Sequence, residues 1–256
     1  MRSVIRHPGL VALRLARFLA LNSRGWREHR RELGRVGKGS DPASCAAWLH
    51  KYGALNLEAI GFRFEHTGKV PTRGMVVCNH LSYLDIPLLV AAGPMVFVSK
   101  AEVANWPMMG ALARCGGTLF LRREQRSHVA EIADAFRPIV ESGTVVTIFP
   151  EGTSSGGDEV LPFRPSLLEP AAANGWPVTP AWLTYEIDPS EGTRADDVAY
   201  WRDMTFAPHF LNLLAKRTIR GRVFFGEPVS GLPDRKQLAR RLHEEVSLLR
   251  ERHAAR

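Results

Sequence analysis

Short apolar segments alternate with longer amphipathic segments along most of the chain, an alternation typical of an α/β sheet covered by helices on both faces. The apolar segments predict strands near residues 62–66, 76–78, 95–99, 118–121, 144–149, 178–185 and 222–229. The segments between them predict helices near residues 42–60, 83–92, 106–114, 127–141, 163–174 and 206–216, and Asp234 caps a last one. Because no repeat or low-complexity linker interrupts this order, we expect residues 41–256 to form one domain and residues 1–40 to form an N-terminal helical appendage.

Two breaks in the pattern predict local irregularity. Pro138 lies inside the helix predicted at residues 127–141 and is expected to bend or shorten it. Residues 186–200 are acidic and contain Pro189 and Gly192, which predicts a surface excursion.

The segment at residues 76–85 carries the first candidate chemistry. An apolar strand there gives way to Asn79 and His80, and Asp85 falls just inside the following helix. His80 would therefore stand at the carboxyl end of a strand, where open α/β sheets bind ligands. A histidine beside a carboxylate is a competent general base near neutral pH. Taken alone, the pair is more typical of a loop histidine and a helix-capping aspartate.

Polar groups also follow three other predicted strands, namely Arg122–Arg123, Glu151–Thr153 and Thr179–Pro180. An arginine at a strand end can hold a phosphate or carboxylate through two parallel hydrogen bonds. Gly152 allows close backbone approach or a positive φ. Taken singly, the two arginines are typical of a solvated loop and Glu151 of a solvated turn. Together the segments bring a base, cations and an acid to one sheet edge, which predicts a single site.

The positive charge of the chain is concentrated at its N-terminus. The formal net charge is +8, and residues 1–38 hold ten Lys or Arg against two Glu, so the other 218 residues are balanced with 24 of each sign. The arginine-rich run at residues 24–38 contains Trp26 as its one aromatic residue and matches no nucleic-acid-binding motif. Nucleic acid is therefore not expected as a partner.

An apolar run at residues 10–21 precedes the arginine-rich run. A transmembrane helix needs about 20 apolar residues, and this run is shorter and contains Arg14 and Arg17. The same arginines argue against a signal peptide. Two interpretations remain open: an amphipathic helix at an anionic membrane surface, and a helix packed on the domain with its arginines in solvent.

The three cysteines, Cys45, Cys78 and Cys115, are scattered and form no Cys-x-x-Cys pair. This pattern indicates reduced, buried thiols in a cytosolic setting and no zinc site. His80 and Asp85 could bind a metal in principle, but no second histidine at useful spacing supports this, so no metal site is predicted.

Four of these segments, in order and spacing, resemble the motif blocks of the glycerolipid acyltransferases of the lysophosphatidic acid acyltransferase (PlsC-like) type. That family has Asn-His-x4-Asp, Gly-x-x-Phe-x-x-Arg and Phe-Pro-Glu-Gly-Thr blocks and a hydrophobic strand carrying proline. The similar segments here are residues 79–85 (NHLSYLD), 117–123 (GTLFLRR), 149–153 (FPEGT) and 178–181 (VTPA), with residues 161–164 (LPFR) similar to a Leu-Pro-Phe-Lys segment. The resemblance covers about residues 60–185 and implies a mixed, largely parallel sheet.

The resemblance implies an O-acyltransferase that moves a fatty acyl group from acyl-CoA or acyl-carrier protein to the hydroxyl of a lysolipid, without a bound cofactor. In such an enzyme His80 would remove the proton of the acceptor hydroxyl, and Asp85 would orient His80. Substrate-binding roles are implied for Asn79, Ser82, Arg122, Arg123, Glu151, Gly152, Thr153 and Pro180. Because the family contains peripheral membrane enzymes, the resemblance also implies a peripheral location at the cytoplasmic face of the cell membrane.

Departures from the family pattern concern the acceptor. Ser154 stands where the family commonly has arginine, Arg122 stands where aspartate is common, and residues 163–166 read FRPS in place of Phe-Lys-x-Gly. Since Arg122, Arg123 and Arg164 can still meet a phosphate, 1-acylglycerol-3-phosphate is the first expected acceptor, giving phosphatidate. A lysolipid without a phosphomonoester, such as a lyso-ornithine lipid, is the alternative.

Two further function classes fit parts of the chain. Residues 152–156 match Gly-x-Ser-x-Gly, the nucleophile elbow of a serine lipase or esterase, which would use Ser154. That elbow leads directly into a helix, whereas residues 156–159 (GGDE) are a poor helix start. The second class is a basic, membrane-binding scaffold without catalysis, against which the intact His80 and Asp85 pair argues.

Overall fold

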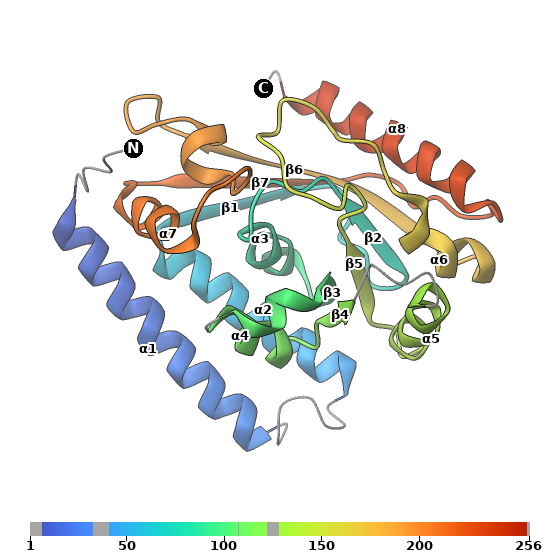
Figure 1. The fold of residues 1–256 in the computed structure, drawn as a ribbon, viewed down its shortest axis with the longest axis horizontal. Helices are drawn as coiled ribbons and strands as arrows, with labels where there is room; N and C mark the ends of the chain where they lie inside the picture. The colour runs from blue at the N-terminus through green and yellow to red at the C-terminus, as the bar shows by residue number, and fades with distance from the viewer. Residues whose placement is uncertain (1–6, 33–40, 107, 122–127, 255–256) are drawn as a thin grey trace.

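A seven-stranded sheet forms the centre of the protein (Figure 1). The structure is a computed structural model that describes residues 7–32, 41–106, 108–121 and 128–254. The strands lie side by side in the order β1-β7-β6-β2-β5-β3-β4. Their bounds are β1 (Phe62–Thr67), β2 (Met75–Cys78), β3 (Met95–Lys100), β4 (Leu119–Leu121), β5 (Val145–Ile148), β6 (Val178–Ile187) and β7 (Ile219–Phe225). Each strand overlaps a predicted one, and β7 begins and ends a few residues earlier than expected.

The sheet is mixed and largely parallel, as the predicted fold class requires. Five neighbouring pairs run parallel, and β6 and β7 run antiparallel. Strands β2 and β5 lie in the middle, and every residue of both is buried. Such strands are apolar throughout because helices cover both of their faces.

Helices form a layer on each face of the sheet (Figure 1). One layer contains α1 (Pro8–Glu32), α2 (Pro42–Ala59), α3 (Asp85–Ala92), α4 (Met109–Cys115) and α7 (Phe206–Ala215). The other layer contains α5 (His128–Glu141), α6 (Glu169–Asn174) and α8 (Arg235–His253). A separate apolar core fills the space between the sheet and each layer.

Several helix boundaries follow from local signals. Asp41 caps α2 by accepting a hydrogen bond from the Ser44 N–H at 3.0 Å, and Asp234 caps α8 in the same way. Pro138 does not shorten α5, which runs on to Glu141. A 3-10 turn precedes each of two helices: Ala101–Asn105 lies before α4, outside the helix predicted at residues 106–114, and Pro165–Leu168 leads into α6.

The predicted surface excursion at residues 186–200 is wrong in its second half. The segment folds back over the sheet edge through a π-type turn, Arg194–Val198. Val198 and Ala199 are fully buried, and the Tyr200 N–H donates to the Leu81 carbonyl at 2.8 Å. The segment is acidic for most of its length but ends in a short apolar stretch, and this stretch packs into the core beside Leu81.

Helix α1 packs against α2 and α7, and a buried arginine fastens it. The guanidinium of Arg14 donates to the carbonyl oxygens of Leu214 and Arg217 at 3.1 and 2.8 Å, and also to that of Lys216. These carbonyls end α7 and follow it, where a helix leaves acceptors without partners. The expectation that the arginines of this helix lie in solvent is therefore wrong for Arg14, which is 7% exposed.

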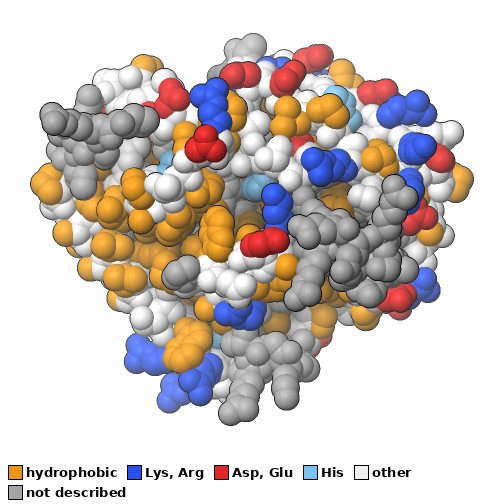
Figure 2. All heavy atoms as spheres, viewed as in Figure 1, with side chains coloured by type: hydrophobic (Ala, Val, Ile, Leu, Met, Phe, Trp, Pro, Cys, Tyr) orange, Lys and Arg blue, Asp and Glu red, His pale blue; other side chains and the backbone are white. Residues whose placement is uncertain are grey.

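The outer side of α1 carries apolar groups in solvent, namely Leu13, Leu19 and Trp26. Hydrophobic side chains gather over the α1 and α7 side of the molecule in Figure 2. Among the helices that the structure describes, each is too short or too polar to cross a lipid bilayer.

Replacing Arg14 with alanine tests the anchoring of α1. The change leaves three backbone carbonyls without their donor, so we expect the free energy of unfolding to fall by about 2 kcal/mol. Urea denaturation of both proteins measures this difference. Arg17→Ala, at an exposed position of the same helix, should change it by less than about 0.5 kcal/mol. Equal effects of the two substitutions would contradict the anchoring role.

Candidate active site

His80 lies directly after β2, at the carboxyl edge of the sheet, with α3 beginning five residues later. Its Nδ1 lies 2.7 Å from Oδ2 of Asp85, the first residue of α3. The ring stacks on Phe149, which follows β5, with centroids 4.2 Å apart and planes inclined by 17°. The side chain of His80 is 25% exposed, whereas that of Asp85 is fully buried. The predicted pair is therefore brought together with Nε2 left to meet a substrate.

The Asp85 carboxylate is held by four donors. Besides His80, its Oδ2 accepts the backbone N–H groups of Leu81 and Ser82 at 2.7 and 3.0 Å. Its Oδ1 accepts the hydroxyl of Tyr185, on β6, at 2.7 Å. Hydrogen bonds to the charged form compensate for burial of a carboxylate. An ionised Asp85 in turn requires the Nδ1–H tautomer of His80, so the lone pair stands on Nε2.

Glu151, for which the resemblance implies a substrate-binding role, is not among the described residues that line the cavity beside His80. Its side chain is 3% exposed, and its two oxygens accept the backbone N–H groups of His80 and Leu161, both at 3.0 Å. Burial is the main cause that raises the pKa of Glu151, to about 8, and the charge of Asp85 raises it further. The Glu151 side chain thus connects the loop after β5 to the segment that holds His80.

Three other residues expected to bind substrate, Asn79, Ser82 and Pro180, are buried in the protein. Asn79 is buried and bridges to β6, donating to the Leu183 carbonyl at 3.1 Å and accepting the Leu183 N–H at 2.8 Å. Ser82 is fully buried, and its hydroxyl has no hydrogen-bond partner in the described part of the chain. Pro180 is a buried residue of β6. Arg122 and Arg123 lie outside the described residues.

Gly152 and Thr153 do line the cavity beside His80. Gly152 has a φ of +76°, a conformation that favours glycine. A Cβ there would lie 3.0 Å from Nε of Arg164, so the glycine also lets that arginine approach the loop. The expectation of a positive φ or a close approach at this position is confirmed on both counts.

The cavity has a volume of 320 Å³ and extends from His80 between α1, α2, α3, α4 and α7. Its walls are mostly apolar and aromatic, and they include Phe18 and Asn22 from α1. A cavity of this kind fits a hydrocarbon chain. Lys100, at the end of β3, is the one lysine or arginine among its described lining residues.

Several residues of the site have little or no signal in the sequence that would identify them. Tyr185 lies about one hundred residues from Asp85 along the chain, and its one signal was a phenol inside an apolar strand, because a buried hydroxyl needs a partner. Tyr83, Trp106, Tyr200 and Phe206 line the cavity but occur in three segments that no motif connects.

Ser154 is not placed as a nucleophile. Its hydroxyl donates to the Tyr200 carbonyl at 2.5 Å. The downstream histidine His209 is engaged elsewhere, with Nδ1 bonded to the Tyr83 hydroxyl and Nε2 to the Ala199 carbonyl, both at 3.0 Å. The geometry gives no support to a serine lipase or esterase.

Comparison with known proteins agrees with the motif blocks. A family model described as Acyltransferase matches residues 61–184. A lyso-ornithine lipid O-acyltransferase from Pseudomonas aeruginosa is 34% identical over 252 residues, which span 93% of this chain and 92% of its own. The chain belongs to the PlsC-like acyltransferase family. The protein is therefore an O-acyltransferase of the class that acts on lysolipids.

Other relatives of the acyltransferase differ in sequence identity and in the fraction of each chain that aligns. A lyso-ornithine lipid O-acyltransferase from Rhodobacter capsulatus is 38% identical over 188 residues, 70% of this chain and 67% of its own. A 1-acyl-sn-glycerol-3-phosphate acyltransferase from Neisseria gonorrhoeae is 34% identical over 115 residues, 45% of each chain. The crystal structure of PlsC from Thermotoga maritima shares the fold, with a TM-score of 0.65, 21% identity and coverage of 95% of this chain and 98% of its own.

Replacing Glu151 with glutamine tests the electrostatics of this site. In the unfolded chain Glu151 titrates near 4.5, and in the folded acyltransferase its pKa is about 8. Between these values the folded state retains a proton that the unfolded state has lost, so the free energy of unfolding falls as pH rises, by at most about 1.4 kcal/mol per pH unit. Glu151→Gln should remove this contribution to the slope, as measured by urea denaturation from pH 5 to pH 8.

Glu159→Gln, a change of an exposed acid in the same loop, is the matched control and should keep the slope of the wild-type protein. Identical slopes for wild type and Glu151→Gln would show that Glu151 does not hold its proton in the folded state.

Proposed function

We propose that the protein transfers a fatty acyl group from an acyl thioester to the hydroxyl of a lyso-ornithine lipid, with His80 as general base. The observation that carries this is the His80–Asp85 pair, with Nδ1 of His80 2.7 Å from Oδ2 of Asp85 and with His80 lining an apolar cavity. The acceptor follows from the relatives. Of the three sequence relatives described above, the two that match the longer stretches of this chain act, by their names, on lyso-ornithine lipid.

The first expectation, 1-acylglycerol-3-phosphate, is the weaker candidate. The Neisseria relative named for that acceptor matches less than half of this chain. Ser154 also stands where the family commonly has an arginine, so one cation expected to meet a phosphate is replaced by a hydroxyl. An ornithine head group is an amino acid and needs no phosphate site.

The reaction balances with this chain's own groups. Nε2 of His80 takes the proton of the acceptor hydroxyl as its oxygen attacks the thioester carbonyl. The tetrahedral intermediate then collapses, the C–S bond breaks, and the imidazolium returns the proton to the departing sulfur. Asp85 stabilises the imidazolium through Nδ1. Proton transfer of this kind contributes about 10²–10⁴-fold, and placing both substrates correctly supplies much of the remainder.

The partners in this proposal are the lysolipid, an acyl-CoA or acyl-carrier-protein donor, and a membrane surface. No tightly bound cofactor enters the reaction. The acyl chain of the donor would enter the apolar cavity, leaving its thioester beside His80.

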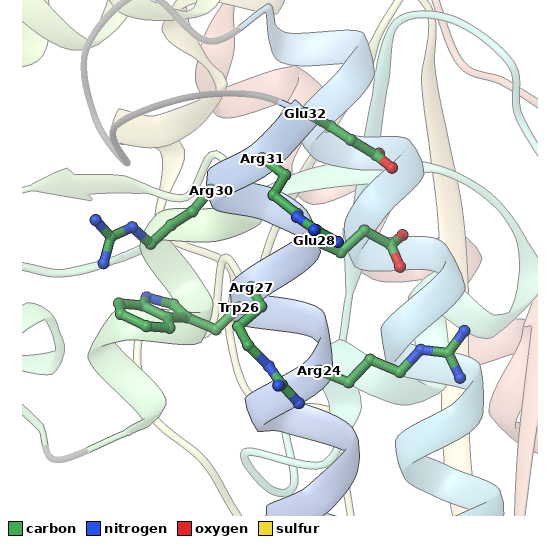
Figure 3. A pocket seen from close by; sticks show the side chains of 7 residues that line it. All are labelled: Arg24, Trp26, Arg27, Glu28, Arg30, Arg31 and Glu32. Carbon is green, nitrogen blue, oxygen red and sulfur yellow. The ribbon is translucent and has the colours of Figure 1, made fainter.

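We also propose that α1 rests on the cytoplasmic face of the cell membrane. Leu13, Leu19 and Trp26 present apolar surface there. Figure 3 shows Trp26 beside Arg30, with Arg24, Arg27 and Arg31 on neighbouring turns, and the Arg30 guanidinium lies 4.7 Å from the Trp26 ring centre. Apolar side chains flanked by arginines match the interface of an anionic bilayer.

An acyl-transfer assay with purified protein tests the proposed reaction. With palmitoyl thioesters of coenzyme A and of carrier protein, we expect acylation of lyso-ornithine lipid in preference to 1-acylglycerol-3-phosphate. His80→Ala should lower kcat by about 10²–10⁴-fold. His66→Ala, at an exposed position on β1, should leave it unchanged. Preference for the phosphate lipid would overturn the acceptor, and equal rates for wild type and His80→Ala would overturn the mechanism.

Vesicle binding tests the membrane proposal. The double variant Leu19→Ser/Trp26→Ser should bind vesicles containing phosphatidylglycerol about tenfold more weakly, because it loses two apolar contacts. Leu248→Ser removes an exposed leucine from α8, on the opposite face of the sheet, and serves as the matched control. The idea fails if both variants bind as wild type does.

A further inference from the structure

Four aromatic side chains line one region of the active-site cavity: Tyr83, Trp106, Tyr200 and Phe206, called here the aromatic cluster. The Tyr83 ring centre lies 5.3 Å from that of Tyr200 and 5.1 Å from that of Phe206. The Trp106 ring centre lies 6.4 and 6.3 Å from the same two rings. All four side chains are partly exposed, so their surfaces are available to a ligand.

The aromatic cluster adjoins the catalytic pair. Tyr83 follows His80 by three residues. The backbone of Tyr200 is bonded to both motif loops, since its N–H donates to the Leu81 carbonyl at 2.8 Å and its carbonyl accepts the Ser154 hydroxyl at 2.5 Å. A head group attached to an acceptor hydroxyl at His80 would therefore reach these rings.

Ser154 connects the aromatic cluster to the departure from the family pattern. Where the family commonly has a cation, this chain has a hydroxyl that holds the backbone of Tyr200 in place. The exchange removes a positive charge near the acceptor and secures the segment that supplies an aromatic ring. A hydroxyl at this position does not repel a positively charged head group, as an arginine would.

The faces of these rings can stabilise a cation. No carboxylate occurs among the described residues that line the cavity. A cation is attracted to the face of an aromatic ring within about 6 Å of its centre. Because the centres of Trp106 and Tyr200 are 6.4 Å apart with planes at 82°, one ammonium group can lie within that distance of both. Lys100, in the same cavity, would repel a bare cation and attract a carboxylate on the same head group.

The arrangement is fixed before any ligand binds. The Tyr83 hydroxyl is held by Nδ1 of His209, whose Nε2 donates to the Ala199 carbonyl. Burial lowers the pKa of His209 to about 4, so the ring is neutral at pH 7 and Nδ1 can accept. A preformed site binds with a smaller loss of conformational entropy.

We propose that the aromatic cluster is the head-group subsite and binds the ammonium group of a zwitterionic, amino-acid-like lysolipid through cation–π contacts, with Lys100 facing its carboxylate. The inference rests on the proposed acyl transfer and specifies the chemical class of its acceptor.

Binding to a catalytically inactive background tests the subsite apart from turnover. In the full-length His80→Ala protein, calorimetry would measure the affinity for three forms of a short-chain, water-soluble N-(3-hydroxyacyl)ornithine. One form has a free side-chain amine, the second has it trimethylated, and the third has it acetylated. The first two carry a cation and should bind alike, whereas the neutral acetylated form should bind about tenfold more weakly.

Substitution of the rings completes the test. Trp106→Leu and Tyr200→Leu should each weaken binding of the two cationic forms several-fold and leave the acetylated form unchanged. Tyr200→Phe, which keeps a ring face, should restore the preference. Trp176→Leu is the control, because Trp176 packs against the core on the far side of the sheet. In protein with His80 intact, the leucine variants should raise KM and leave kcat nearly unchanged.

The outcomes separate the two proposals. Equal affinity of the inactive protein for the amine and acetylated forms would overturn the subsite, as would leucine variants that weaken both forms equally, since the rings would then form only an apolar wall. Discrimination in binding without acyl transfer by the wild-type protein would support the subsite and overturn the proposed function.

Discussion

The buried carboxylate of Asp85 is the constraint on which the site depends. A charge without exposure to solvent is stable only where hydrogen bonds replace water. Two parts of the chain supply them: the His80–Ser82 turn and Tyr185 on β6. Because both parts must meet at one side chain, the orientation of the His80 imidazole depends on the register of β6 in the sheet as well as on the local loop.

Two residues of the motif blocks, Asn79 and Glu151, form hydrogen bonds within that scaffold. Asn79 joins the end of β2 to β6 through both of its amide atoms. Glu151 joins the loop after β5 to the backbone of His80 and Leu161. A sequence motif can thus contain residues that fix the conformation of a loop by hydrogen bonds, as well as residues that could react.

The pattern of apolar segments was sufficient to predict the α/β fold, and the resemblance of residues 79–85 to a family motif block was sufficient to predict the contact of His80 with Asp85. Both depend on short-range order: strand and helix periods, and five residues of chain. What the sequence could not show depends on long-range contacts. The Asp85–Tyr185 bond spans one hundred residues, and burial of Arg14 depends on the carbonyls that follow α7, two hundred residues away. The surface excursion predicted for residues 186–200 was wrong in part because the prediction followed the many acidic residues, whereas the few apolar residues at the end of the segment pack inward.

Helix α1 has two sides with different neighbours. Leu19 and Trp26 face outward, and Phe18 and Asn22 line the cavity. A helix with its side chains is about 10 Å across. If the outer side rests on lipid, an acyl chain in the cavity is separated from the bilayer by the width of one helix. An acyl chain could then pass between the bilayer and the cavity over that short path. It would not have to be exposed to water on the way, so its hydration would add no kinetic barrier to the transfer.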